Sequence, residues 1–348
     1  MKKKTLLSFA FAVLIASSAW SQQYVTQIKD ASKKWGYVNL KGEIIIQPQF
    51  EKCYEFSSDG YAPIYDTKNR QYYFINVKGE KLQTEISGFK LIDGFGIDVK
   101  GFENGLVPVK NGEKWGYMNT SGKLAILAKY EDPTVFNGGH AVVKSGTSYI
   151  VLNTKGEEFP VEGSVLDVKP FSEGLAPYRA ADKKFGFIAE NGKVAIPAQF
   201  ESVGYFKDGL AWAKTADKKL GYINTKGEWV IKPQFDVGKE FDVKSGVARV
   251  KTGDVWGYVS KTGNVTHVDT DLFGDFSNGL AQGKKNGKFG FYNVKGEWVI
   301  EAKFDGSRDF KNGYAAAKQG DKWGIINTQG EWVIKPTFEA IKDMELVK

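Results

Sequence analysis

A glycine recurs along this chain at spacings of 33 to 43 residues, each time in a similar context. The fullest form of that context is Trp35-Gly36-Tyr37-Val38-Asn39-Leu40-Lys41-Gly42-Glu43, and it returns near the C-terminus at residues 323–331. The recurring glycines are Gly42, Gly79, Gly122, Gly156, Gly192, Gly227, Gly263, Gly296 and Gly330. A period of this size along a whole chain indicates a repeat architecture, in which each unit buries its apolar faces against its neighbours.

The first residues have the pattern of a secretory signal peptide. Three lysines, at positions 2 to 4, precede an apolar stretch over residues 6–16, and Ala19 and Ser21 supply the small residues of a cleavage site. The apolar stretch is too short to span a bilayer. We therefore expect cleavage near Ser21, with residues 1–21 removed, and a mature chain at 22–348 that is secreted, periplasmic or on the cell surface. No other stretch reaches membrane length, so the mature chain is expected to have no membrane span.

The charge and the cysteine content argue against a nucleic-acid partner, an internal disulfide and a thiolate metal cluster. The whole chain has a net charge of +7, and removal of the signal peptide takes away three lysines and no acid. The resulting charge of +4 is too small to indicate a nucleic-acid-binding surface. Cys53 is the single cysteine, so no internal disulfide or thiolate metal cluster can form. With 42% hydrophobic residues, the chain has the material for a large buried core.

Each repeat contains three strand-like runs. The first follows a Phe-x-x-Gly turn, as at residues 102–110, the second carries the Trp-Gly pair, and the third ends in a run such as residues 228–235. Asn-Gly or a similar polar turn joins the first two runs, and Asn-x-x-Gly joins the last two. Both turns are typical of hairpins. The unit is therefore predicted to be a three-stranded antiparallel meander, with room for a short fourth strand in the connection.

Both faces of the predicted sheet are apolar. Trp35 and Tyr37 point to one face, and Gly36 and Val38 point to the other. A sheet with one face in water would alternate between apolar and polar residues. Each sheet is therefore expected to lie between two neighbours, with the glycine allowing the neighbouring layer to approach closely.

Such sheets can form an open stacked array or close into a β-propeller. Nine units exceed the four to eight blades that propellers typically have. The second and fourth units are degenerate, because Tyr72-Tyr73 and Tyr149-Ile150 stand where the other units have the Trp-Gly pair or its equivalent. These observations favour an all-β chain of about nine units in an open stacked array, with a β-propeller-like closure as the alternative.

The Trp-Gly-Tyr-Val-Asn phrase, the Asn-x-Lys-Gly turn, the Ile-x-Pro-x-Phe run and the Phe-x-x-Gly-Leu-Ala opening resemble the WG-repeat (KWG-like) family of bacterial proteins. The resemblance covers the chain from about residue 24 to its end. It implies a secreted or surface repeat protein and brings no catalytic residue with it.

No motif indicates catalysis, a cofactor or a metal site. The chain lacks a P-loop, a Gly-x-Ser-x-Gly elbow and a His-Glu-x-x-His motif. His140 and His267 stand at positions where other repeats have core residues such as Leu175 and Ile300. The glutamates that follow the recurring glycines are interpreted as solvated turn residues, because a catalytic acid needs one unusual environment. The chain is therefore predicted not to be an enzyme and to bind no cofactor or metal.

One register position varies while its surroundings stay uniform. The residue after the Leu-Ala of the first run is Pro63, Pro108, Val142, Pro177, Trp212, Arg249, Gln282 or Ala316. We interpret this variation as a position with little packing demand, and Trp212, Arg249 and Gln282 become the candidate binding residues. The predicted function is a protein-binding or scaffold module for an unknown protein or cell-envelope component. The alternative is a carbohydrate-binding protein, in which an aromatic such as Trp212 stacks on a glycan.

Overall fold

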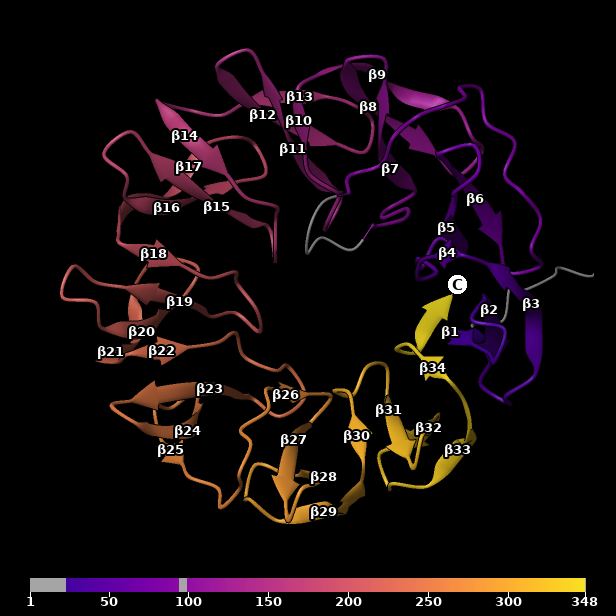
Figure 1. The fold of residues 1–348 in the computed structure, drawn as a ribbon. Helices are drawn as coiled ribbons and strands as arrows, with labels where there is room; N and C mark the ends of the chain where they lie inside the picture. The colour runs from indigo at the N-terminus through magenta and orange to yellow at the C-terminus, as the bar shows by residue number, and fades with distance from the viewer. Residues whose placement is uncertain (1–22, 94–98, 348) are drawn as a thin grey trace, which may run out of the picture.

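The structure is a computed structural model that describes residues 23–93 and 99–347, so the predicted signal peptide lies outside the described residues. Within these ranges the chain forms strands and turns and no helix; consequently no helix there could cross a membrane. The strands make nine small antiparallel sheets, which follow one another around a central opening (Figure 1). The all-β repeat prediction is confirmed, and the arrangement is a nine-bladed β-propeller. The predicted open stacked array is wrong, and the alternative of closure is correct.

The sheets are numbered here as blades 1 to 9 in chain order. Blade 1 contains β1 (Gln23–Lys29), β2 (Trp35–Asn39), β3 (Ile44–Phe50), β34 (Ala340–Ile341) and β35 (Glu345–Val347). Blade 2 contains β4 (Lys52–Cys53), β5 (Tyr61–Asp66) and β6 (Gln71–Asn76), and blade 3 contains β7 (Leu106–Asn111), β8 (Lys114–Asn119) and β9 (Leu124–Tyr130). Blade 4 contains β10 (Asp132–Pro133), β11 (His140–Ser145), β12 (Ser148–Asn153) and β13 (Glu158–Pro160). Blade 5 contains β14 (Val165–Val168), β15 (Leu175–Ala180), β16 (Phe185–Ala189) and β17 (Val194–Phe200).

The remaining blades follow the same order. Blade 6 contains β18 (Ser202–Val203), β19 (Ala211–Lys214), β20 (Leu220–Ile223) and β21 (Trp229–Phe235). Blade 7 contains β22 (Val237–Gly238), β23 (Val247–Thr252), β24 (Val255–Ser260) and β25 (Val265–Thr266). Blade 8 contains β26 (Phe276–Ser277), β27 (Leu280–Lys285), β28 (Lys288–Tyr292) and β29 (Trp298–Phe304). Blade 9 contains β30 (Gly306–Ser307), β31 (Tyr314–Gln319), β32 (Lys322–Asn327) and β33 (Trp332–Phe338).

Most blades are meanders of three strands preceded by a short strand. In blade 6, for example, the order across the sheet is β18-β19-β20-β21. The short first strands, such as β4 and β26, lie toward the central opening, and the last strands, such as β29 and β33, lie at the outer side of the ring (Figure 1). The predicted meander, including its short fourth strand, is confirmed.

The two ends of the chain close the ring by sharing blade 1. Strand β1 pairs with β2 along one edge and with β34 and β35 along the other, where Ile28 lies opposite Ile341 and Gln23 opposite Val347. Among the described residues, the C-terminal segment supplies the strands that pair with this edge of β1. An open array would leave this edge of β1 unpaired, and unpaired strand edges are costly or aggregation-prone. This pairing is the physical reason for closure.

The glycine of the Trp-Gly pair makes room for a bulge inside its own blade. In blade 6, Leu220 lies opposite Phe235 but Tyr222 lies opposite Ile231, so four residues of β21 span two of β20. A Cβ at Gly221 would lie 2.4 Å from the carbonyl oxygen of Ile231 and 2.7 Å from the nitrogen of Pro233. The expectation that this glycine admits the neighbouring blade is therefore wrong, because the close atoms belong to the third strand of the same blade.

Every blade that has the bulge also has this glycine. The same register shift is found in the six blades 1, 3, 5, 6, 8 and 9, and all of them have the Trp-Gly glycine or its equivalent. In the degenerate fourth unit, Ile150 replaces the glycine, and β12 and β13 pair without a shift. Blade 7 keeps Gly257, but β25 is only two residues long and its ladder is also regular. The WG phrase therefore encodes a bulged hairpin.

The two apolar faces of each blade pack on different neighbours, as predicted. Tyr37 of β2 lies in one core cluster with Ile64 and Ile75 of blade 2, whereas Val38 packs with Ile325 and Ile334 of blade 9. At six junctions an edge-to-face pair joins the aromatic two residues after the Trp position to the phenylalanine of the next Phe-x-x-Gly turn. The pairs are Tyr37–Phe56, Tyr117–Phe136, Phe187–Phe206, Tyr222–Phe241, Tyr258–Phe276 and Phe291–Phe310, with centroids 4.6–4.9 Å apart.

The tyrosines among these aromatics also tie each blade to the connection that follows. The Tyr222 hydroxyl donates to the carbonyl oxygen of Lys239 at 2.9 Å, and Tyr37 and Tyr117 make the same bond to Tyr54 and Thr134. We predict that Tyr222→Phe lowers the free energy of unfolding by about 1–2 kcal/mol, because it removes a partly buried hydrogen bond. Denaturant unfolding would measure the change. Phe187 occupies the same position in blade 5, so a phenylalanine ring fits there. An unchanged denaturant midpoint would show that a water molecule replaces the lost hydroxyl.

The Asn-x-x-Gly turns are built as predicted, and they also contact the preceding blade. In blade 6 the Asn224 side-chain oxygen accepts backbone bonds from Lys226 and Glu228, and Gly227 adopts a φ of +82°. A Cβ at Gly227 would lie 2.9 Å from the Ile196 side chain of blade 5. Glycine is therefore required twice at this position, for the left-handed conformation and for the close contact.

Candidate functional site

The Phe-x-x-Gly turns form the inner border of the ring (Figure 1), and polar side chains link them from blade to blade. At five junctions, a side chain just before or within one turn accepts a hydrogen bond from a backbone N–H of the next turn. The pairs are Asp59–Gly105, Asn104–Gly139, Glu173–Gly209, Asp242–Gly279 and Asn278–Gly313, with distances of 2.9–3.1 Å. At two further junctions an amide donates to a carbonyl oxygen, from Asn137 to Phe171 and from Asn312 to Met344. These bonds hold the inner border in one geometry.

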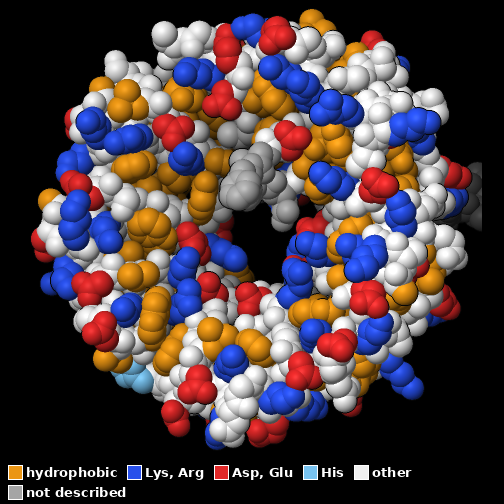
Figure 2. All heavy atoms as spheres, in the orientation of Figure 1, with side chains coloured by type: hydrophobic (Ala, Val, Ile, Leu, Met, Phe, Trp, Pro, Cys, Tyr) orange, Lys and Arg blue, Asp and Glu red, His pale blue; other side chains and the backbone are white. Residues whose placement is uncertain are grey.

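The residue just before the phenylalanine of each turn divides the inner border into two unlike parts. Blades 7, 8, 9, 1 and 2 carry an acid there, and Met344 takes the place of the phenylalanine in blade 1. The five acids, called the acid arc below, are Glu240, Asp275, Asp309, Asp343 and Glu55. Blades 3 to 6 carry Gly101, Val135, Pro170 and Tyr205 at the same position. Figure 2 shows that charged side chains of both signs surround the opening on the face that it draws.

The acids of the arc influence one another. Asp309 is open to solvent at the inner border, but the surrounding protein displaces part of its hydration and raises its pKa, and the negative charges of Asp275 and Asp343 raise it further. Burial also raises the pKa of Asp343, and the adjacent Arg308 opposes this effect. Arg249 lies 2.8 Å from the Asp275 carboxylate through its Nε. The acids of the arc are thus close enough to influence one another, with Arg249 paired to Asp275 and Arg308 beside Asp343.

A cavity of about 370 Å³ lies where the ring closes, between blades 9, 1, 2 and 3. Its lining includes Glu55, Glu103, Lys311 and Glu345, together with apolar atoms of Val99. The Lys311 ammonium lies 2.5 Å from the Glu345 carboxylate and 3.5 Å from that of Glu55. Burial raises the pKa of Glu103, and the negative charge of Asp59 adds to this shift. The closure therefore concentrates acidic groups around one lysine.

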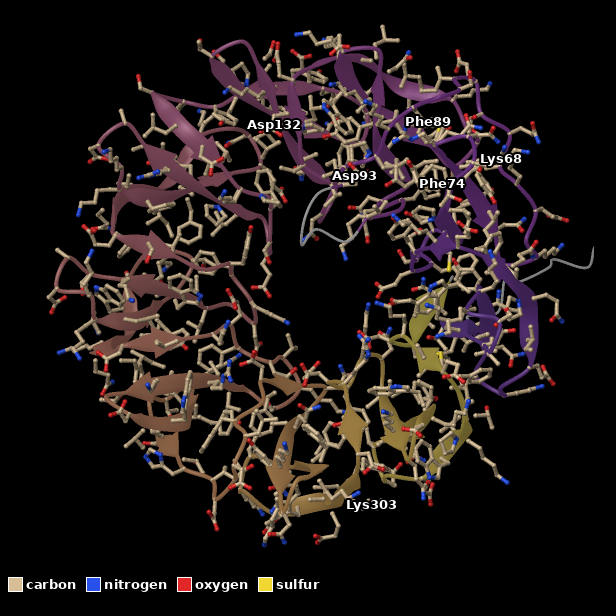
Figure 3. All side chains as sticks on the ribbon, viewed as in Figure 1. Lys68, Phe74, Phe89, Asp93, Asp132 and Lys303 are labelled. Carbon is tan, nitrogen blue, oxygen red and sulfur yellow. The ribbon has the colours of Figure 1, made fainter. Side chains whose placement is uncertain are left out.

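The longest spacing between repeats, from Gly79 to Gly122, adds a segment next to this cavity. Phe89 of that segment stacks on Phe74 of β6, with ring centroids 5.9 Å apart, and the Tyr72 hydroxyl donates to Asp93 at 2.7 Å (Figure 3). Lys90 pairs with Lys110 at the edge of β7, where other blades have their short first strand. In blade 3, a single bridge from this segment thus takes the place of the short first strand that other blades have.

The three residues predicted to bind a partner all bridge to the next blade. The Trp212 indole N–H donates to Glu240 at 3.1 Å, and the Gln282 amide donates to the carbonyl oxygen of Ser307 at 2.8 Å. The Arg249 guanidinium donates to the carbonyl oxygen of Phe273 and stacks over Trp256, 4.7 Å from the ring centroid. All three are partly buried. Their role in binding stays a prediction, but the premise that this register has little packing demand is wrong.

The two histidines make different contacts. His140 Nδ1 lies 3.3 Å from a Glu190 carboxylate oxygen of the next blade. His267 is exposed, and its Nδ1 lies 2.9 Å from the Trp256 carbonyl oxygen, while Val268 is buried against Gly296 in its place. Across residues 23–93 and 99–347, no group of three or more His, Cys, Asp or Glu side chains is arranged to hold a metal ion.

Sequence reasoning missed the acid arc, although its signal was present. The phenylalanine of the Phe-x-x-Gly turn recurs, and the residue before it can be aligned across the blades by eye. Along the chain, four consecutive acids in that register follow four small, apolar or aromatic residues, and Glu55 stands before those four. The alignment does not show that the ring closes. Closure makes blades 9, 1 and 2 neighbours, so that Glu55 joins the four other acids of the arc.

The fold and its inner border define the class: a β-propeller built from tandem repeats and closed by its two termini. The sequence profile described as "WG containing repeat" matches residues 35–65, 98–115, 115–146, 185–218, 221–256, 289–323 and 323–345. These segments make up more than half of the chain, which therefore belongs to the WG-repeat family. The family predicted from the sequence is confirmed.

The solved structures that this chain is similar to share little sequence with it. BamB from Moraxella catarrhalis is 11% identical, with 80% of this chain and 94% of that chain covered and a TM-score of 0.43. The WD40 β-propeller domain of Doa1 is 12% identical, with coverages of 64% and 88% and a TM-score of 0.31. A chain described as KlHsv2 with loop 6CD replaced by a Gly-Ser linker is 9% identical, with coverages of 71% and 96% and a TM-score of 0.39. The comparison with curated proteins found no match.

Proposed function

We propose that this chain is a non-enzymatic binding ring that holds a protein or cell-envelope partner at its inner border. The proposal rests on one observation: the residues that recur from repeat to repeat pack the core, whereas the residues at the inner border differ between blades. The aromatics of the WG phrase are used for packing, as shown by Tyr37, Tyr117 and Tyr222, which have no exposed surface. The inner border is where the blades differ, and differences among repeats are where repeat scaffolds encode specificity.

The rigidity of the inner border supports binding. Side chains that link one turn to the next fix the backbone of these turns, so a partner would not have to order them. Preorganised surfaces bind more tightly because less conformational entropy is lost on association. The acid arc places an acid at a position where blades 3 to 6 carry none, and this difference favours one orientation of a bound partner.

The proposed place of action is outside the cytoplasm. The support for this is the basic and apolar pattern of residues 2–16, followed by Ala19 and Ser21. N-terminal sequencing of the protein from its source cell should begin at or close to Gln22. An intact Met1 on the exported protein would contradict cleavage.

The test of partner binding compares two variants that each lose two acids. Asp309→Asn with Asp343→Asn changes the acid arc, and Glu228→Gln with Glu331→Gln changes two exposed turn glutamates. A partner crosslinked to the wild-type ring in envelope extracts would be identified, purified and titrated against all three proteins. We expect binding about ten-fold weaker for the arc variant and unchanged for the turn variant. Equal affinities for all three would contradict binding at the arc.

A glycan array with Trp212→Ala distinguishes the carbohydrate alternative. In the wild type, the Trp212 indole lies between Gly204 and Glu240. If the wild-type protein binds a glycan and the variant does not, this result would favour a carbohydrate ligand over a protein partner. No signal with either protein would leave the protein partner as the function to pursue.

A further inference from the structure

The closure of the ring differs chemically from most blade junctions. Side-chain amides and hydroxyls link several other inner turns, for example Ser172 to the carbonyl oxygen of Phe206 and Ser277 to that of Phe310. At the closure, by contrast, Glu345 of β35 lies against Glu55 of blade 2, and both carboxyl groups contact the Lys311 ammonium of blade 9. Two carboxylates thus share one cation in a place where the Glu345 side chain is only 12% exposed.

The wider surroundings contain equal numbers of acids and bases, but in contact with Glu345 there are one carboxyl group, that of Glu55, and one ammonium group, that of Lys311. Lys100, Glu103 and Asn312 line the same cavity, and Asp343 and Lys342 lie between β34 and β35 beside Arg308. The described groups that face Glu345 and its immediate neighbours are therefore Glu55, Lys100, Glu103, Arg308, Lys311, Lys342 and Asp343. The Glu345 carboxylate is poorly hydrated and is repelled by the Glu55 carboxylate beside it, and a proton on Glu345 removes this repulsion.

We propose that β35 is a pH-sensitive latch, which holds the ring closed firmly under mildly acidic conditions and loosens as Glu345, in contact with Glu55, loses its proton. The hydrogen-bonded part of this strand is short, three residues opposite Gln23–Val25. A short terminal strand opens locally at low free-energy cost, so one unfavourable charge pair has a measurable effect on it.

The direction of the pH effect follows from the environment of Glu345. Burial raises its pKa to about 7, Lys311 opposes the shift, and Glu55 adds to it. In the released strand the same group would titrate near its ordinary value of 4.5. The closed state therefore binds more protons between these two values, and closure weakens as pH rises through this window and levels off above it. Between pH 6 and pH 8 the equilibrium constant for opening should increase about ten-fold.

Cys53 gives a local readout of this opening. It is the single cysteine of the chain, and it is buried in one cluster with Val347 of β35 and Val25 of β1. The Gln27 amide of β1 also contacts its sulfur at 3.3 Å. Release of β35 removes Val347 from the cluster, so the rate of modification by a thiol reagent reports how often the latch opens.

The experiment measures the Cys53 modification rate at pH 6 and pH 8, divided at each pH by the rate in the denatured chain. This ratio removes the pH dependence of the thiolate itself. We expect an increase of about ten-fold for the wild type and little or no increase for Glu345→Gln, which keeps the shape and removes the titration. The control Glu339→Gln changes an exposed acid next to β34, whose pKa is lowered by Lys322, and should behave like the wild type.

Two results would overturn the latch. One is a wild-type ratio that does not change with pH, and the other is a Glu345→Gln protein with the wild-type profile. If Glu345→Gln does not fold, Glu55→Gln provides the same test from blade 2, because it removes the second carboxylate of the pair. A flattened profile in that variant would support the latch, and an unchanged one would contradict it.

Discussion

Gly221→Ala is expected to lower the free energy of unfolding by about 3 kcal/mol, although it adds a single methyl group. The added Cβ would lie 2.4 Å from the Ile231 carbonyl oxygen and 2.7 Å from the Pro233 nitrogen, and neither backbone atom can turn aside. The bulge of β21 would have to open, and the ladder between β20 and β21 would be lost with it. Denaturant unfolding followed by tryptophan fluorescence would measure the loss.

The matched control is Gly257→Ala in blade 7. Its Cβ would meet the Val265 side chain at 2.8 Å first, in a blade whose third strand has no bulge and whose Val265 is exposed. The expected loss is smaller, about 1 kcal/mol, because an exposed side chain can move. Equal losses in the two variants would show that the bulge is not what requires the glycine.

Phe206→Ala is expected to destabilise the ring by about 3–5 kcal/mol. Phe206 has no exposed surface and meets Phe187 of the preceding blade edge to face, with centroids 4.7 Å apart. Truncation leaves a cavity at a junction between two blades, where backbone hydrogen bonds prevent collapse. Thermal unfolding would show a lower midpoint, and the protein would expose more apolar surface to a fluorescent dye.

The neighbouring Tyr205→Ala is the control for that experiment. Tyr205 is 37% exposed and stands one residue earlier in the same turn, so its truncation should change stability by about 0.5 kcal/mol or less. A small loss for Phe206→Ala would mean that the aromatic pairs are not what hold neighbouring blades together.

Local structure could be predicted from the sequence because it depends on residues that are close in the chain. Asn224 and Gly227 specify a hairpin turn wherever they occur, and the structure has that turn with its side-chain bonds to Lys226 and Glu228. The alternation around Tyr37 and Val38 likewise predicted two buried faces, and the two residues pack on blades 2 and 9.

The candidate site was predictable only in part. Variation among the repeats drew attention to positions other than the WG phrase, and at these positions Trp212 and Gln282 bridge adjacent blades. A sequence shows that a position varies, and it does not show whether the variable side chain faces water or a neighbour. The acid arc needed a further step, because Glu55 joins Asp343 and Asp309 only when the last blade meets the first.

The sequence by itself determined the repeat, the three-strand unit, its turns and its family, because each of these depends on hydrogen bonds and side-chain alternation within about forty residues. The tertiary structure alone decided that the units form a closed ring. That outcome depends on the twist added at every blade and on a contact between Gln23–Val25 and Glu345–Val347, which lie at opposite ends of the chain. The same contact creates the cluster of Glu55, Lys311 and Glu345, which no local pattern in the sequence predicts.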